Sequence, residues 1–192
     1  MNGQIITIAF VVVAIVGIAY IIMYNGLKKL FIGTQSAWSD IDIQLKRRND
    51  LIPNLVNTVK GYAKYEQGTL TKVTELRSAM DTALNASDVD RQQVNKLNNQ
   101  LHGQVTQLLA VAENYPDLKA SESYLNLQRQ LVDTEDKISS ARRFYNIGAG
   151  NLNGKVATFP WNIVAKIHGI HAVDFYKAEL TDTEREPTKV EF

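Results

Sequence analysis

The feature that most constrains this chain is an apolar run near its start. Residues 5–24 (IITIAFVVVAIVGIAYIIMY) contain seven Ile, four Val and one Phe, and no charged side chain precedes Lys28. A helix of this length rises about 30 Å, which matches the hydrocarbon core of a bilayer. These twelve large side chains together favour insertion by about 4 to 6 kcal/mol. We therefore expect a transmembrane helix over residues 5–24, after a short N-terminal end of residues 1–4.

A cleaved signal peptide is the alternative interpretation of this run. The first residues (MNGQ) carry no basic side chain, and no small-residue cleavage site follows the run, so a retained anchor is favoured. Lys28 and Lys29 follow the run, whereas only the α-amino group balances them on the other side. The positive-inside rule then predicts an outer N-terminus and a cytoplasmic domain over residues 25–192.

Composition narrows the function classes. The formal net charge is +1, so no strong field indicates a nucleic-acid partner. The chain has no Cys, which excludes disulfides, thiolate metal sites and a cysteine nucleophile. Pro is scarce, at four residues, and Leu, Gln, Lys, Ala and Asn dominate the middle of the chain. This composition is typical of a helical domain.

Apolar residues recur at spacings of three and four along most of residues 38–152. The first series is Trp38, Ile41, Leu45, Ile52, Leu55, Val59, Tyr62, Leu70, Val73, Leu76 and Met80. The second is Val94, Leu97, Leu101, Val105, Leu108 and Ala112, and the third is Tyr124, Leu127, Leu131, Thr134, Ile138, Ala141, Tyr145, Gly148 and Leu152. Such seams predict long helices that pack at shallow angles, and short connections make neighbours antiparallel. The expected fold is all-α: a transmembrane helix followed by an elongated antiparallel helical bundle, four-helix-bundle-like, over residues 25–158.

The first series contains possible breaks. At Pro53, either Asp50 caps a new helix or one long helix kinks, and we favour a kink or brief break because no glycine accompanies the proline. Gly61 and Gly68 are expected to weaken the helix locally, by about 1 kcal/mol each.

Three further segments interrupt or weaken the pattern. A turn is expected at about residues 84–88, with Ser87 or Asp88 as the cap of the next helix. Residues 113–121 (ENYPDLKAS) predict a connection. The glycines and asparagines of residues 147–154 (IGAGNLNG) weaken the helix prediction there.

Residues 159–180 form an aromatic C-terminal segment without clean periodicity, and residues 181–192 form a polar tail. The simpler interpretation is that this segment folds back over the bundle. The alternative is contact with a membrane surface or a partner, since Trp and Tyr suit such interfaces. The candidate contact residues are Phe159, Trp161, Phe175 and Tyr176.

No pattern of residues indicates catalysis. The Glu-x-x-His pairs of di-iron bundles do not occur in this sequence, whose histidines are His102, His168 and His171. The last two form an H-x-x-H pair, and we expect no acidic residue to complete a ligand set with them. Nucleophile-elbow and phosphate-loop motifs are also missing. We therefore expect no catalytic residue, no bound metal and no cofactor.

Two groups of charges form a candidate interaction surface. The residues are Arg47, Arg48, Asp50, Glu135, Asp136, Arg142 and Arg143. Glu135 and Arg142 are seven residues apart and point the same way on a helix, as do Asp136 and Arg143. Salt bridges on a solvated flank are the favoured interpretation, each worth well under about 1 kcal/mol. The alternative is a surface that recognises an identical copy or another protein.

Four long motifs resemble those of the LemA family of bacterial membrane proteins. They are WSDIDIQLKRRNDLIPNLVNTVKGYAKYE (38–66), AENYPDLKAS (112–121), LVDTEDKISSARRFYN (131–146) and FPWNIVA (159–165). The sequence departs from the family pattern at Asn49 and Tyr65, where many members have His, and at residues 147–153, where a more charged helix is usual.

The resemblance implies a single-pass protein of the bacterial cytoplasmic (inner) membrane, with an outer N-terminus, an inner helical bundle and no established enzymatic activity. It also gives weight to the matching motif positions. These are Arg47, Arg48, Asp50, Pro53, Asn54, Tyr115, Pro116, Asp117, Arg142, Arg143, Tyr145 and Asn146.

Two functions follow as hypotheses. The first is a non-enzymatic scaffold that associates with itself on the lipid bilayer and organises or remodels the membrane. The alternative is an adaptor or regulator of another membrane protein, such as an envelope-stress protease or sensor. A third hypothesis, that the protein is an unrecognised hydrolase, is the least favoured.

Overall fold

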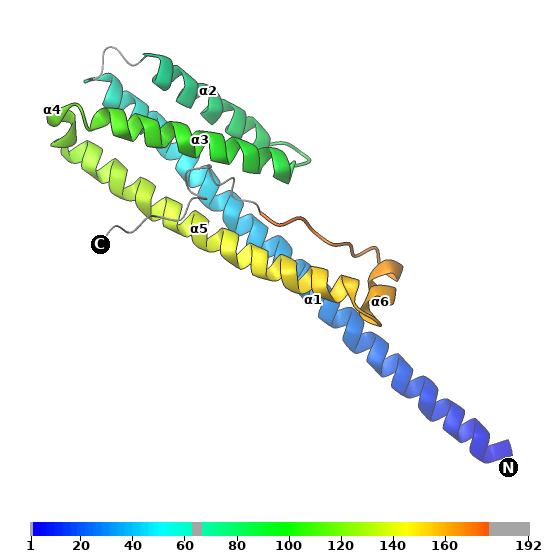
Figure 1. The fold of residues 1–192 in the computed structure, drawn as a ribbon. Coiled ribbons are helices and arrows are strands. Elements are labelled where there is room, and N and C mark those ends of the chain that lie inside the picture. Colours follow the sequence, from blue (N-terminus) through cyan, green and yellow to red (C-terminus); the bar gives the residue numbers. More distant parts are fainter. Residues whose placement is uncertain (1, 63–66, 177–192) are drawn as a thin grey trace, which may run out of the picture. The chain divides into compact units, whose positions relative to one another are not determined.

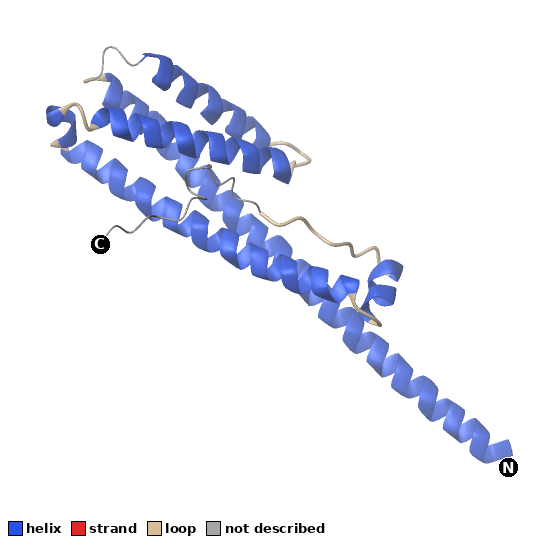
Figure 2. Ribbon diagram, viewed as in Figure 1, coloured by secondary structure: helices blue, strands red, loops and turns tan. Residues whose placement is uncertain are grey.

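The computed structural model describes residues 2–62 and 67–176, and in these ranges every regular element is a helix (Figures 1 and 2). The helices in chain order are α1 (Asn2–Lys60), α2 (Gln67–Leu84), α3 (Arg91–Ala112), α4 (Pro116–Lys119), α5 (Glu122–Ala157) and α6 (Trp161–Ile167). The expectation of an all-α chain with long helices is confirmed.

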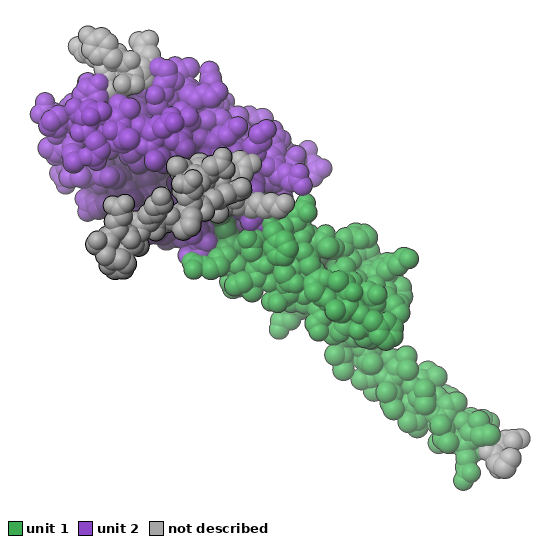
Figure 3. Space-filling view, in the orientation of Figure 1, with its two compact units in different colours: residues 1–40, 141–175 green, residues 41–140, 176–192 purple. Residues whose placement is uncertain are grey.

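The chain divides into two compact units (Figure 3). Unit 1 comprises residues 1–40 and 141–175, and unit 2 comprises residues 41–140 and 176–192. Helices α1 and α5 contribute residues to both units, whereas α2, α3 and α4 belong to unit 2 and α6 belongs to unit 1.

The first part of α1 is long and apolar enough to cross a membrane. Its most apolar window of 18 residues has a mean hydropathy of 3.0, and none of that window is buried in the protein. Phe10 is 79% exposed and Val13 is 70% exposed. A helix that is apolar on every face and uncovered by protein has the character of a membrane span.

Pro53 lies inside α1, and the helix continues past it to Lys60. The proline removes one backbone hydrogen bond, but its neighbours Ile52 and Leu55 are 1% and 0% exposed, so burial on both sides favours an unbroken helix. A local weakening of the helix was expected at Gly61. The helix instead ends immediately before this residue, at Lys60. Gly61 and Tyr62 form a turn in which the Tyr62 amide donates to the Val59 carbonyl at 3.0 Å. Tyr62 is 45% exposed and so lies outside the buried seam.

Unit 2 has its core where the seams of four helices meet. The fully buried side chains that fill it include Ile41, Leu45, Ile52, Leu55, Met80, Leu101, Leu108 and Ile138. Helices α2 and α3 pack against each other and are joined by the short segment 85–90.

The cap of α3 differs from the expectation of Ser87 or Asp88. Asp90 is the N-cap, and its carboxylate accepts hydrogen bonds from the amides of Gln92 at 2.9 Å and Gln93 at 3.2 Å. Its extended backbone places the carboxylate over the free amides of the first turn. The connection expected at residues 113–121 is present and contains the single turn α4, with Pro116 at its start.

In unit 1, α1 and α5 run antiparallel. The rings of Trp38 and Tyr145 meet edge to face with centroids 5.2 Å apart. Towards the N-terminus of α1, Thr34 lies against Gly148. Residues 147–154 are helical within α5, contrary to the weakness their glycines implied. The reason is packing: Ala149 and Leu152 are both 0% exposed, so buried contacts outweigh the low helix propensity of glycine.

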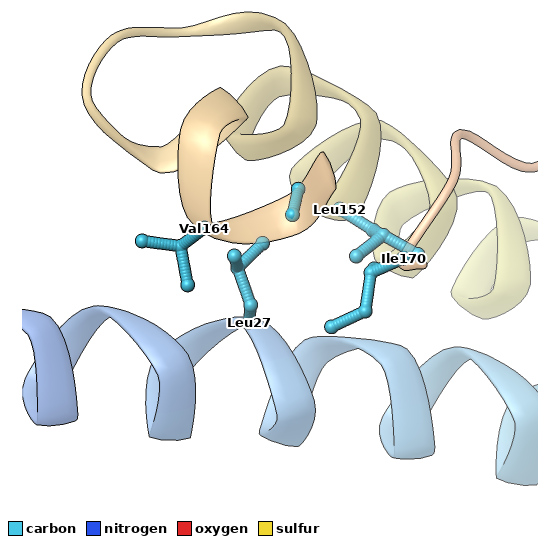
Figure 4. Packing of buried hydrophobic residues seen from close by; sticks show 5 residues of the cluster. Leu27, Leu152, Val164 and Ile170 are labelled. Atoms are coloured by element: carbon cyan, nitrogen blue, oxygen red, sulfur yellow. The ribbon is translucent and has the colours of Figure 1, made fainter. Parts of the chain in front are cut away.

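The segment that follows α5 folds back onto unit 1. Val164, Ala165 and Ile170 form a cluster with Leu27 of α1 and Leu152 of α5 (Figure 4). Gly169 has a φ of +63°, a left-handed conformation that glycine adopts without strain, and it turns the chain after α6.

Beyond that turn the chain is tied to α5. The side-chain amide of Asn153 donates to the Val173 carbonyl at 2.8 Å and accepts from the Val173 amide at 2.9 Å. The Tyr145 hydroxyl donates to the Asp174 carbonyl at 2.8 Å. The expected polar tail, residues 181–192, and the last four residues of the expected aromatic segment lie outside the described residues.

The core of unit 2 gives a direct stability prediction. Leu108→Ala removes a fully buried side chain from α3 and leaves a cavity, so we expect a loss of about 2–5 kcal/mol in the free energy of unfolding. The control is Gln107→Ala at the exposed neighbouring position, which should change it by less than about 0.5 kcal/mol. Denaturant unfolding of the full chain in detergent micelles measures both, and equal effects would contradict the assigned core.

Candidate functional site

Arg48 is buried, and this corrects its expected place on an interaction surface. Its side chain is 3% exposed and lies in unit 2. Its Nη1 atom donates to Oε2 of Glu135 at 2.9 Å. Its Nη2 atom donates to the backbone carbonyl of Asn98 at 3.3 Å and also to the side-chain oxygen of the same residue. One guanidinium therefore joins α1, α3 and α5.

Glu135 is shared between two basic groups. Besides Arg48, the ring nitrogen Nδ1 of His102 lies 3.5 Å from Glu135 Oε2. A buried guanidinium needs such partners, because removing a charge from water costs several kcal/mol that only good hydrogen bonds offset. This arrangement fixes which helices pair within unit 2.

The other candidate charges are at least partly exposed. Arg47 Nη2 lies 3.6 Å from Asp133 Oδ2, with both side chains about half exposed. Asp50, Asp136 and Arg143 are exposed, and Arg142 is partly buried. Arg142 and Arg143 belong to unit 1, whereas the other five candidates belong to unit 2.

Asp133 is a carboxylate of unit 2 with a clear pKa shift. The ammonium of Lys137 donates to Asp133 Oδ2 at 2.8 Å, and this hydrogen bond holds the pKa of Asp133 below its usual value. Burial opposes that shift, while the charges of Lys137 and Arg47 reinforce it. Sequence patterns missed Asp133, although its spacing of four from Lys137 is the usual signal of a helical ion pair.

The four aromatic candidates have different surroundings. Phe159 is 77% exposed, and Phe175 is 49% exposed beside Gly150. Trp161 is partly buried: its ring lies against Gly26, and the Lys155 ammonium sits 4.2 Å from the ring centroid. Tyr176 is only 5% exposed, so it is a core residue and not a contact residue.

Two aliphatic residues next to these aromatics were missed by the sequence interpretation. Ile163 is 51% exposed and Ile167 is 63% exposed, on the same short helix as Trp161. Their spacing of four residues places both on one side of α6. That spacing was the signal in the sequence, but a helix of seven residues is too short to show a clear period.

The three histidines of the sequence, His102, His168 and His171, are divided between the two units. His102 lies beside Glu135 in unit 2, whereas His168 and His171 are exposed in unit 1. Within the described ranges, no group of three or more His, Asp or Glu side chains is arranged to hold a metal ion.

The contacts of Arg48 predict that substitutions at Arg48 and at Arg47 change the free energy of unfolding by different amounts. Arg48→Met should cost about 3–5 kcal/mol in the free energy of unfolding, because Glu135 and Asn98 lose their buried partner. Arg48→Met with Glu135→Leu should recover most of that loss, since no charge is then left unpaired. Arg47→Ala, at the exposed pair, should cost less than about 1 kcal/mol. Denaturant unfolding measures all three, and equal losses for the Arg47 and Arg48 single variants would contradict the assigned role.

The contact between Asp133 and Lys137 predicts that the pKa of Asp133 changes when Lys137 is replaced. A carboxyl whose pKa is lowered on folding stabilises the folded state above its unfolded pKa, about 3.9, and loses that contribution as pH falls through the lower folded value. Lys137→Met should raise the Asp133 pKa towards the ordinary value in an NMR titration of the carboxyl carbon. Lys72→Met, which removes the partner of Glu75 elsewhere in unit 2, should leave it unchanged. An unaltered Asp133 pKa in Lys137→Met would reject the contact.

Comparison with known proteins identifies the family. The LemA family model matches residues 37–192, which covers unit 2 and most of unit 1 outside the apolar start of α1. Protein LemA of Metamycoplasma hominis is 33% identical over 144 residues, which is 75% of this chain and 64% of that protein. Magnetosome protein MamQ of Magnetospirillum gryphiswaldense is 22% identical over 174 residues, which is 80% of this chain and 64% of that protein.

A second magnetosome relative gives the same picture. Magnetosome protein MamQ 2 of Paramagnetospirillum magneticum is 23% identical over 180 residues. The chain thus spans just under two thirds of the length of these relatives. None of these names is that of an enzyme, and the apolar helix α1 fits a membrane protein. With its family model matched over most of its length, the chain belongs to the LemA family.

Proposed function

We propose that this protein is a non-enzymatic scaffold that is anchored in the bacterial cytoplasmic membrane by the start of α1 and associates with its own copies. The short N-terminal end lies outside, and the helical domain lies in the cytoplasm. The contacts between copies organise or remodel the bilayer to which they are tethered.

Membrane anchoring supports self-association by raising local concentration. Copies held in one membrane plane meet at a higher effective concentration than free copies, so weak lateral contacts are enough to join them. The uncovered apolar window of α1 is the feature that would tether them.

The observation that carries the proposal is an exposed apolar face on α5 in unit 2. Val132 is 57% exposed and Leu125 is 40% exposed. A shallow groove runs past them, lined by Leu125, Gln128, Arg129, Val132, Asp133 and Asp136. Large apolar side chains at a spacing of seven on one helix face are typical of helix–helix contacts.

Charges on the same face are suited to a second copy. Leu125, Arg129, Val132 and Asp136 follow one another at spacings of four, three and four, so they share one side of α5. A face with both a cation and an anion beside its apolar residues offers each charge an opposite partner on an identical face. This self-complementarity favours homo-oligomers over an unrelated partner.

Val132→Asp tests the face without disturbing the fold. The residue is exposed, so the thermal midpoint should stay within a few degrees. Burying an added carboxylate between copies, beside Asp133 and Asp136, should weaken association about tenfold or more. The matched control is Ile43→Asp, at an Ile on α1 that is 60% exposed. Light scattering of the full-length protein in mild detergent, over a range of concentrations, gives the particle mass.

The expected result is an oligomer that dissociates in Val132→Asp and persists in Ile43→Asp. A wild-type protein that stays monomeric at every concentration, in detergent and after reconstitution in vesicles, would contradict the scaffold. A monomer that instead forms a defined complex with another membrane protein would favour the adaptor role. Loss of assembly in both variants would reject the assigned face.

A further inference from the structure

The segment 159–168, which we call the collar, is fixed to α1 near the end of its apolar run. The hydroxyl of Tyr20 and Nε2 of His168 share a hydrogen bond of 2.7 Å. The ring centroids of Tyr24 and His168 lie 4.3 Å apart. Trp161 lies so close to Gly26 that a Cβ there would come within 2.9 Å of its ring. The collar therefore cannot move along α1 without breaking these contacts.

This attachment sets the depth of the collar. If residues 5–24 fill the hydrocarbon core, the contacts at Tyr20 and Tyr24 lie within about 6 Å inside its edge. The contacts at Gly26 and Leu27 lie within about 5 Å outside it. The headgroup layer on each side of a bilayer is about 5–8 Å thick. The collar is thus positioned where acyl chains give way to headgroups.

The exposed side of the collar carries three large apolar residues, with the polar side chains of Asn162 and Lys166 beside them. Val164 and Ala165 of α6 are 2% and 1% exposed and pack towards Leu27 (Figure 4). Phe159, Ile163 and Ile167 are exposed by 77%, 51% and 63%. Helix α6 therefore has a buried apolar side, formed by Val164 and Ala165, and exposed apolar residues, Ile163 and Ile167, away from it.

The charge of unit 1 is suited to an anionic surface. Unit 1 contains six Lys or Arg side chains and only two acidic ones, Asp40 and Asp174, so its formal net charge is +4 with His neutral. Because the whole chain carries +1, unit 2 carries −3. Lys28, Lys29, Lys155 and Lys166 are all exposed near the collar contacts. Basic side chains beside an apolar face are typical of segments that lie on anionic lipid.

We propose that the collar lies in the headgroup layer of the same membrane that α1 crosses, with Phe159, Ile163 and Ile167 inserted at the acyl boundary and the nearby lysines against anionic headgroups. Its occupant is lipid and not a second copy, because the fixed contacts with Tyr20 and Tyr24 already place this face at the bilayer surface. The inference rests on the membrane anchoring in the proposed function and is independent of self-association.

Site-specific labelling tests this placement in the full-length protein. The chain has no Cys, so single variants Ile163→Cys and Ile167→Cys each carry one environment-sensitive NBD label. The labelled proteins are reconstituted in vesicles of phosphatidylcholine with or without 30% phosphatidylglycerol. Aqueous iodide and lipids with spin labels at shallow or deep positions act as quenchers. Ile43→Cys, equally exposed but in unit 2, is the aqueous control, and Ile15→Cys, inside the apolar run, reports the anchor.

We expect labels at 163 and 167 to be quenched by the shallow lipid probe and several-fold less by iodide than the label at 43. Protection should increase when phosphatidylglycerol is present. Iodide quenching equal to that at position 43 would contradict the placement of the collar in the headgroup layer, provided that the label at 15 is quenched by the deep probe. Protection from both iodide and lipid probes would mean that protein covers the face, which also overturns the proposal. A label at 15 that no lipid probe reaches would reject the anchoring itself.

Discussion

The apolar window at the start of α1 is not buried by the protein. The environment that covers this surface is the constraint on which the other features of the structure depend. The twelve large hydrophobic side chains from Ile5 to Ile22 are each between 52% and 79% exposed. In water this surface would be unfavourable by about 25 cal/mol for each Å². A bilayer would remove that cost and would fix the membrane depth of every residue that packs against this helix. Because α1 continues without interruption to Lys60, the anchor and the domain share one backbone.

Within unit 1, α5 runs antiparallel to α1. It brings the chain after residue 157 back beside the residues that follow the apolar run of α1. Leu27 and Leu152 then share a core with Val164, Ala165 and Ile170. The Asn153 side chain holds the stretch that follows by its hydrogen bonds to Val173. In unit 2, the equivalent organising contact is polar, because Arg48 binds both Glu135 and Asn98. Apolar packing thus stabilises unit 1 beside the apolar run. In unit 2, a buried ion pair joins the helices.

Helix type and burial could be predicted from the sequence because spacing reports them directly. Ile41, Leu45, Leu101, Leu108 and Ile138 were all expected in seams and all are buried. The continuity of helices was harder to predict, because the helix at Pro53 and at residues 147–154 depends on tertiary burial that local propensity does not register. Arg48 was assigned to the surface because a charge is usually solvated, and only the positions of Asn98 and Glu135 reveal its partners. Ile163 and Ile167 were missed because the seven residues of α6 give too little periodicity.

Extraction of membranes at alkaline pH tests the central claim most directly. Cells or vesicles containing the intact chain are treated with sodium carbonate at about pH 11 and then with urea, and the chain is followed by its intact mass. Because the uncovered run of α1 lies in lipid in this account, the full-length protein should remain in the sedimented membranes after both treatments. Release of the uncleaved chain into the supernatant would show that no helix crosses the bilayer, and the account would fail.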